Sequence, residues 1–127
     1  MNYLIDSSAW IDYFIGSDRG LKLNTLLFTE TDTFFTIEPC LAEIHAWSIK
    51  HHLDFSVFLS IIRANSELLS LSEQNWIDAG KERYEQRKKQ KDFGLIDATL
   101  VVKQKEINCK IVSSDVHFRQ LKNTVFI

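Results

Sequence analysis

Short apolar segments alternate along this chain with longer segments whose apolar residues recur every three or four positions. The short segments have the length of buried β-strands, and the spacing in the longer ones is that of an α-helix with one face turned to a core. This alternation predicts an α/β fold with a central, mostly parallel sheet of four or five strands and helices on both faces. The expected strands cover residues 3–5, 34–37, 68–71, 111–113 and 125–127, and the expected helices cover residues 7–15, 21–28, 39–49, 53–64, 73–91, 95–105 and 117–121.

Length and composition indicate an ordinary globular protein. The chain has 127 residues, of which 45% are hydrophobic and 25% charged, and we expect one domain over residues 1–127. No stretch approaches the roughly 18 apolar residues of a membrane span, and no signal-peptide pattern opens the chain, so we expect a cytoplasmic protein that does not enter a membrane. The net charge of -2 gives no overall attraction to nucleic acid. Binding to nucleic acid would therefore need a local basic patch or a bound cation.

Four acidic residues lie at similar places in the predicted elements. Asp6 directly follows the first strand, and Asp115 comes just after the fourth strand in "KIVSSDVHF". Glu43 lies one turn into the helix after the second strand, and Asp97 lies in the first turn of the apolar helix "GLIDATLVV". Ligands of open parallel sheets bind at the carboxyl ends of the strands, where the strand order reverses. We therefore expect these acids to gather at that edge.

Each of these acids also has a purely structural explanation. Asp6 and Asp115 precede helices and could cap them, Asp97 could favour the positive end of its helix, and Glu43 could be a surface residue. The four together fit these explanations poorly, because three lie among apolar residues and clustered carboxylates repel one another.

Clustered carboxylates are stable as anions around a hard cation, and Mg²⁺ or Mn²⁺ prefers ligands of this kind. Such a cation activates water and neutralises charge on a phosphate, which are the two needs of phosphodiester hydrolysis. The acids therefore predict a Mg²⁺ or Mn²⁺ site with hydrolytic chemistry.

The motifs resemble those of the PIN domain family, most closely the VapC-like toxin ribonucleases of type II toxin–antitoxin systems. The similarity covers the full chain in motif order, from "LIDSSAWI" through "LAEI" and "GLIDATLV" to "IVSSDVHF". It implies a PIN-like nuclease domain that cleaves RNA with Mg²⁺ or Mn²⁺, has a cognate antitoxin protein as partner and forms a homodimer. By this match the catalytic residues and metal ligands are Asp6, Glu43, Asp97 and Asp115.

Three further polar residues are candidates beside these four acids, two of them from the same comparison of motifs. Ser8 and Ser113 match the hydroxyl positions beside the first and fourth acids and are expected to be auxiliary polar residues. Asp92 lies near Asp97 in the sequence and competes with it for the role of third acid, or acts as an auxiliary acid.

The helix predicted over residues 73–91 has a basic end that could meet the RNA backbone. Arg87 and Lys88 are the residues that we expect to make this contact. The alternative is a solvated helix face, on which Glu82 and Glu85 form local ion pairs with the basic residues.

Other functions remain open at this point. A structure-specific DNA nuclease would use the same metal chemistry, but such enzymes usually carry extra helical elements. A metal-dependent phosphoryl-transfer domain of the phosphatase kind would have a second aspartate two residues after Asp6, where Ser8 stands. A non-catalytic RNA-binding module with the same fold is disfavoured because all four acids are present.

Overall fold

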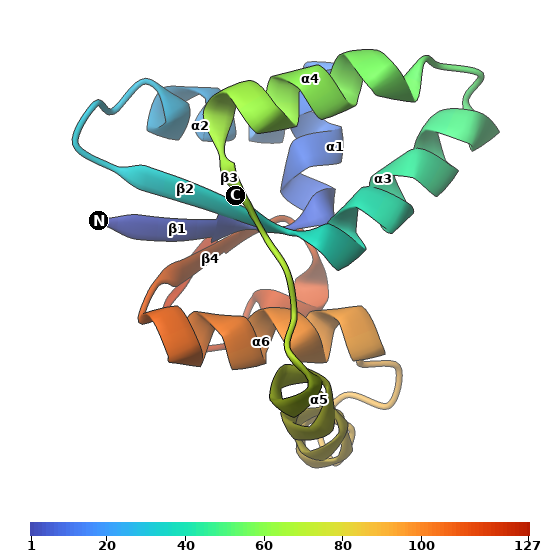
Figure 1. The fold of residues 1–127 in the computed structure, drawn as a ribbon, viewed down its shortest axis with the longest axis vertical. Helices are drawn as coiled ribbons and strands as arrows, with labels where there is room; N and C mark the ends of the chain where they lie inside the picture. Colours follow the sequence, from blue (N-terminus) through green and yellow to red (C-terminus); the bar gives the residue numbers. More distant parts are fainter.

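The computed structural model describes all residues 1–127 and contains a five-stranded sheet between two layers of helices (Figure 1). The strands lie in the order β3-β2-β1-β4-β5, and every neighbouring pair is parallel. The α/β fold predicted from the alternation of segments is confirmed. The strands are β1 (Asn2–Ile5), β2 (Thr33–Ile37), β3 (Glu67–Leu69), β4 (Lys110–Ser113) and β5 (Thr124–Phe126).

Helices cover both faces of the sheet, as the sequence predicted (Figure 1). The first face carries α1 (Ser7–Ile15), α2 (Asp18–Leu27), α3 (Glu38–Lys50) and α4 (Phe55–Asn65). The second face carries α5 (Glu73–Gln86) and α6 (Leu95–Ile107), and a short 3₁₀ helix, η1 (Val116–Phe118), follows β4. None of the helices combines the length and the hydrophobicity that crossing a membrane requires.

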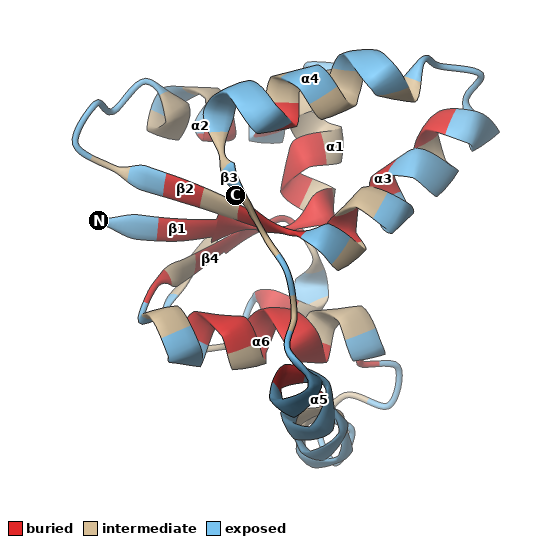
Figure 2. Ribbon diagram, viewed as in Figure 1, coloured by how far each residue is buried: buried red, intermediate tan, exposed pale blue.

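The core consists of two apolar clusters, one on each face of the sheet. Tyr3 and Ile5 of β1 belong to the cluster under α1, whereas Leu4 between them belongs to the cluster under α6. Successive side chains of a strand point to opposite faces, so a strand covered on both sides must be apolar throughout. Figure 2 shows the result as buried residues along β1 and on the sides of α1 and α6 that face the sheet. This explains why Tyr3, Leu4 and Ile5 of β1 form an unbroken apolar run.

The helix predicted over residues 117–121 is the shorter 3₁₀ helix η1, and of the other helix boundaries two differ most from the prediction. Helix α2 begins at Asp18 rather than near residue 21, because Ser17 accepts a hydrogen bond from Gly20 N and caps a polar first turn. Helix α5 ends at Gln86 rather than near residue 91. The chain turns there because Phe93 is fully buried, and a helix continued to residue 91 could not bring it to the core.

The strand order reverses between β1 and β4. From β1 the chain adds β2 and β3 on one side, and it then crosses to place β4 and β5 on the other. Ile5 pairs with Val112, and the Asp6 backbone N–H donates to Val112 O at 2.9 Å. The residues that follow β1 and β4 therefore lie side by side at the carboxyl edge of the sheet, where ligands of such folds bind.

Helices α1 and α2 approach each other closely at Gly20, and this contact offers a test of the fold. A Cβ at Gly20 would overlap the backbone carbonyl of Asp12 and lie 2.7 Å from Tyr13 Cα. We expect Gly20→Ala to lower the free energy of unfolding by about 1–3 kcal/mol in urea denaturation, because backbone atoms must move. Gly80→Ala is the control: Gly80 lies within α5 with no atom within 4 Å of such a Cβ, so a gain of about 0.5–1 kcal/mol is expected. Equal effects of the two substitutions would contradict the close packing.

Candidate functional site

Asp6 is buried directly after β1, with 2% of its surface exposed. Its backbone oxygen accepts from the N–H groups of Ala9 and Trp10, but its side chain makes no capping hydrogen bond. The carboxylate instead accepts from the hydroxyls of Ser8 and Ser113, both at 2.8 Å from Oδ2. Capping therefore does not explain this carboxylate, and the two serines predicted as auxiliary polar residues are its hydrogen-bond partners.

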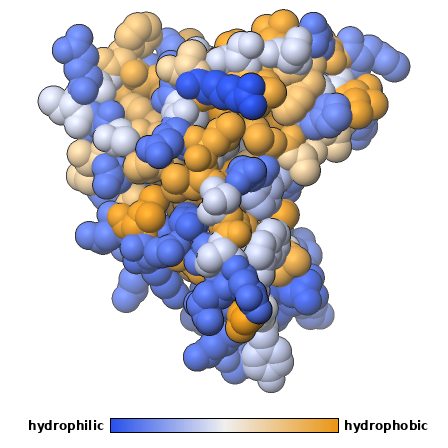
Figure 3. Space-filling model, viewed as in Figure 1, coloured by the Kyte–Doolittle hydropathy of each residue, from blue (hydrophilic) through white to orange (hydrophobic).

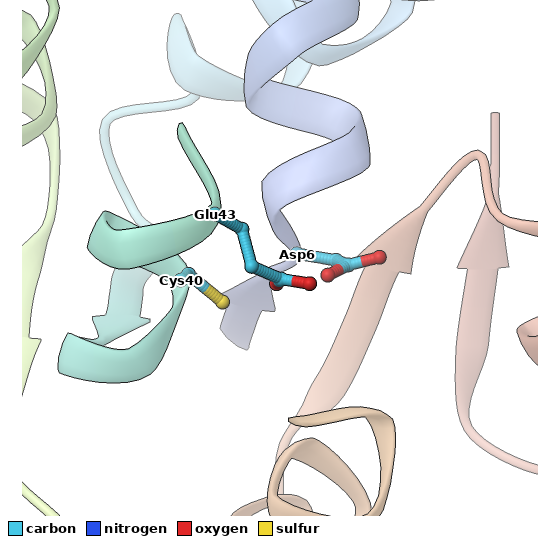
Figure 4. A group of neighbouring side chains, drawn as sticks. All are labelled: Asp6, Cys40 and Glu43. Atoms are coloured by element: carbon cyan, nitrogen blue, oxygen red, sulfur yellow. The ribbon is translucent and has the colours of Figure 1, made fainter. Parts of the chain in front are cut away.

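Glu43 of α3 reaches the same place from another part of the chain. Ser7 Oγ donates to Glu43 Oε1 at 2.8 Å and lies 3.3 Å from Asp6 Oδ1. Figure 4 shows the carboxylates of Glu43 and Asp6 directed toward the same space. Ser7, which the sequence analysis did not single out, thus connects two of the predicted acids.

The thiol of Cys40 lies beside this pair (Figure 4), with one ligand atom each of Asp6, Cys40 and Glu43 within 4.8 Å of one another. Burial, together with the charges of Asp6 and Glu43, raises the pKa of Cys40 well above its usual value. The side chain is therefore a neutral, fully buried thiol that packs between the carboxylates and the core.

Asp97 and Asp115 form a second pair at the same edge of the sheet. Asp97 Oδ2 accepts from Gly94 N at 3.2 Å, and Asp115 Oδ1 accepts from His117 N at 2.9 Å. Each acid therefore stabilises the start of its own helix, which is the structural role that the sequence analysis offered as the alternative to metal binding. Each uses a single carboxylate oxygen for this, and the other oxygen accepts no hydrogen bond in the structure.

The four acids influence one another electrostatically. Burial raises the pKa of Glu43 to about 7, and the charges of Asp6, Asp97 and Asp115 add to the shift. Although Glu43 as a residue is exposed, its carboxyl group lies against enough protein to be partly desolvated. Burial also raises the pKa of Asp97 to about 6, with further contributions from Asp6 and Asp115, and it raises the pKa of Asp6. The protein therefore holds these carboxylates where ionisation is unfavourable unless a cation is near.

The basic side chain within this group is His117, which the sequence analysis missed. Its Nδ1 lies 3.0 Å from Asp97 Oδ2 and 3.3 Å from Asp115 Oδ1, and its Nε2 lies 3.2 Å from Asp92 Oδ1. Burial by itself would lower the pKa of His117, but the charges of Asp115, Asp97 and Asp92 outweigh it and raise the pKa. The lysine ion pairs of the protein go to other acids, outside this group.

Asp92 contacts the group only through His117. Its side chain is 85% exposed, in the loop between α5 and α6, whereas the side chain of Asp97 is 14% exposed. The structure thus groups Asp97 with Asp115, near enough to Asp6 and Glu43 for their charges to interact, and it leaves Asp92 at the rim.

Arg87 and Lys88 have contacts of their own at the end of α5. Arg87 Nε donates to Phe93 O at 2.9 Å and so braces the loop that leads to Asp97. Lys88 pairs with Glu85 at 3.0 Å and lies 5.1 Å from the ring centre of Tyr84. The pair of Lys88 with Glu85 is one of the local ion pairs that the sequence analysis weighed against RNA binding. Glu82, the other acid named there, pairs with Lys105 of α6 instead.

The raised pKa values predict how the stability of the metal-free protein depends on pH. Glu43 and Asp97 bind protons more tightly in the folded chain, with pKa values of about 7 and about 6, than in the unfolded chain. The contribution of these two groups to stability is therefore highest at low pH and is lost as the pH rises through their folded pKa values. We expect the Tm measured by calorimetry in EDTA to be a few degrees higher at about pH 5.5 than at about pH 8. Glu43→Gln should flatten this dependence, and a Tm that rises with pH would contradict the burial of the acids.

No protein-family model matches this sequence, and no curated protein matches it either. Solved structures do match, over nearly the whole of both chains. VapC20 of Mycobacterium tuberculosis, described as a Sarcin-Ricin loop cleaving toxin, has a TM-score of 0.76 at 15% identity, over 98% of each chain. VapBC2 of Rickettsia felis, solved bound to a DNA fragment from its promoter, has a TM-score of 0.72 at 18% identity, over 100% of this chain and 98% of that one.

A third match is VapBC-1 of nontypeable Haemophilus influenzae, with a TM-score of 0.70 at 14% identity, over 100% of this chain and 97% of that one. At such identities the similarity concerns the fold. It agrees with the parallel α/β architecture described above. The chain therefore has the PIN-like fold of the VapC proteins.

Proposed function

We propose that this protein is a divalent-metal-dependent endoribonuclease, and that it acts as the toxin of a toxin–antitoxin pair. The observation that carries the proposal is the gathering of four carboxylates, from four separate parts of the chain, in two groups at the carboxyl edge of the sheet whose charges act on one another. These are the catalytic residues and metal ligands that we assign: Asp6, Glu43, Asp97 and Asp115.

The donors at this edge fit Mg²⁺ or Mn²⁺. Both ions prefer carboxylate oxygens, and one oxygen each of Glu43, Asp97 and Asp115 accepts no hydrogen bond from the protein. A cation also offsets the mutual repulsion of these carboxylates. A divalent cation held here would lower the pKa of a water molecule and neutralise charge on a phosphate.

The side chains of the protein supply binding and orientation in this scheme. The carboxylates hold the cation, and Ser8 and Ser113 fix the orientation of Asp6 through their hydrogen bonds to its Oδ2. Ser7 does the same for Glu43. Without a cation the acidic edge would repel an RNA phosphate, so the same carboxylates make both substrate binding and cleavage depend on metal. No side chain has to act as a nucleophile.

RNA contacts at the end of α5 are a second part of the proposal. Arg87 and Lys88, together with Gly80, Arg83 and Tyr84, line a shallow hollow of about 440 Å³. Hydrophilic side chains gather over α5 in the space-filling view (Figure 3). The loop that Arg87 braces leads from this hollow to Asp97, so an RNA strand crossing the basic surface would pass close to the acids.

The partner proteins follow from the same comparison. The similar structures from Rickettsia felis and Haemophilus influenzae are VapBC proteins, and one of them was solved with promoter DNA. We propose that this chain likewise binds a cognate antitoxin protein. We also propose that it forms a homodimer, which rests on the resemblance of its motifs alone.

A cleavage assay tests the proposed activity. Purified protein is incubated with structured and single-stranded RNAs and with DNAs of matched sequence, in Mn²⁺, in Mg²⁺ and in EDTA. We expect RNA cleavage in the presence of either metal and none in EDTA.

The other outcomes separate the alternatives. Equal cleavage of DNA would favour a DNA nuclease, and metal-independent cleavage would remove the role given to the acids. If neither polymer is cut although Mn²⁺ binds, a metal-dependent phosphoryl-transfer domain becomes the better explanation.

A further inference from the structure

His117 approaches three carboxylates but has no role in the function proposed above. We propose that it is a positioning residue, which holds Asp97 and Asp115 at the separation that a bound divalent cation requires. The inference rests on the proposed metal site and assigns a function to the one basic side chain within it.

The placement of the ring supports this role. Nδ1 lies between the two acids, 3.0 Å from Asp97 Oδ2 and 3.3 Å from Asp115 Oδ1. A proton on Nδ1 lets one nitrogen donate to both carboxylates. Asp97 and Asp115 come from different elements, α6 and the loop after β4, and no other side chain forms a hydrogen bond or an ion pair with both. The backbone N–H groups of Gly94 and His117 each stabilise one of the acids, but only the His117 ring lies between them and offsets their mutual repulsion.

In both Asp97 and Asp115, one carboxylate oxygen binds protein donors and the other is left for a cation. Asp97 Oδ2 accepts from Gly94 N and lies against His117 Nδ1, while Asp115 Oδ1 accepts from His117 N and lies against the same Nδ1. All protein donors thus meet one oxygen of each acid. The second oxygen of each remains available to a cation, which is the arrangement by which outer groups orient metal-binding carboxylates.

The ring is itself held in place. His117 is 18% exposed, its ring packs edge-on against Phe93 with ring centres 5.8 Å apart, and its backbone oxygen accepts from Gln90 Nε2 at 3.0 Å. On the outer side, Nε2 faces the exposed Asp92 at 3.2 Å. This gives Asp92 an auxiliary role that acts through the ring rather than on the metal.

The test compares substitutions that keep one or the other ring nitrogen. Asparagine places its amide nitrogen where His117 has Nδ1, whereas glutamine places it where His117 has Nε2. We expect His117→Ala and His117→Gln to weaken Mn²⁺ binding by about 10–100-fold in isothermal titration calorimetry. His117→Asn should restore most of the affinity. The Tm of each variant in EDTA shows whether it is folded.

The outcomes distinguish this inference from the proposed function. If the unchanged protein binds no Mn²⁺ at millimolar concentration, both the metal site and the positioning role are wrong. If it binds Mn²⁺ and His117→Ala binds equally well, only the positioning role is wrong. Equal weakening by asparagine and glutamine in folded variants would also overturn it, because the position of the donor would then not matter.

Discussion

Asp6→Asn is expected to reduce RNA cleavage by more than about 100-fold, which exceeds the usual effect of removing a group that only orients a metal ligand. Asp6 is the most buried of the four acids and is the one that directly follows the central strand β1. An asparagine has no negative charge with which to bind a cation and offers it one weak oxygen ligand instead of a carboxylate. The loss should appear in the rate of cleavage at saturating Mn²⁺ as well as in the affinity for Mn²⁺.

The same substitution should leave the fold intact or more stable. Ser8 and Ser113 both donate to Oδ2 of Asp6, so the amide oxygen of an asparagine in that place can accept both hydrogen bonds. Its NH₂ group then lies where Oδ1 was, near Ser7 Oγ, which can accept. Because burial raises the pKa of Asp6, its charge costs stability at neutral pH, and the asparagine removes that cost.

Calorimetry in EDTA and the cleavage assay measure the two parts of this prediction on the same protein. Asp78→Asn is the matched control: Asp78 is exposed on α5 and hydrogen-bonds only to Gln74, so neither Tm nor cleavage should change appreciably. Wild-type cleavage by a folded Asp6→Asn protein would remove Asp6 from the catalytic residues. A large fall in its Tm would show that the carboxylate is needed for structure instead.

The strands of this fold were predictable from sequence because a strand buried on both faces appears as a run of consecutive apolar residues. Tyr3, Leu4 and Ile5 form an unbroken apolar run, and each of them packs into one of the two core clusters. The end of α5 was not predictable in the same way. Residues 87–91 are good helix formers, and the prediction extended the helix through them. What ends the helix is a tertiary requirement, the burial of Phe93 beside Phe118.

The four acids were predictable because each stands next to an element whose end could be located. Ser7 and His117 were not, for a physical reason. Ser7 and Ser8 are neighbours in sequence, but at successive positions of a helix they point in different directions. Ser7 reaches Glu43 and Oδ1 of Asp6, whereas Ser8 reaches Oδ2 of Asp6 and Ser113. His117 meets Asp92 and Asp97 only after the chain folds. Its place two residues after Asp115 was the one local signal.

Asp97→Asn and Asp92→Asn should differ sharply in cleavage, although the two residues are five positions apart and both contact His117. Asp97 is mostly buried, and its pKa of about 6 reflects this burial together with the charges of Asp6 and Asp115. We expect Asp97→Asn to abolish cleavage, with a loss greater than about 100-fold, because it removes a proposed metal ligand. Its amide oxygen can still accept from Gly94 N, so the fold should be retained.

Asp92→Asn should change cleavage by less than about 10-fold, because contacts of a strongly exposed carboxylate contribute little. Cleavage rates at saturating Mn²⁺, with the Tm of each variant in EDTA, provide the comparison. Retained activity in a folded Asp97→Asn protein, together with a loss in Asp92→Asn, would assign the third acid to Asp92. The exposed loop between α5 and α6 would then have to fold inward when metal binds, because in this structure Asp92 reaches the other acids only through His117.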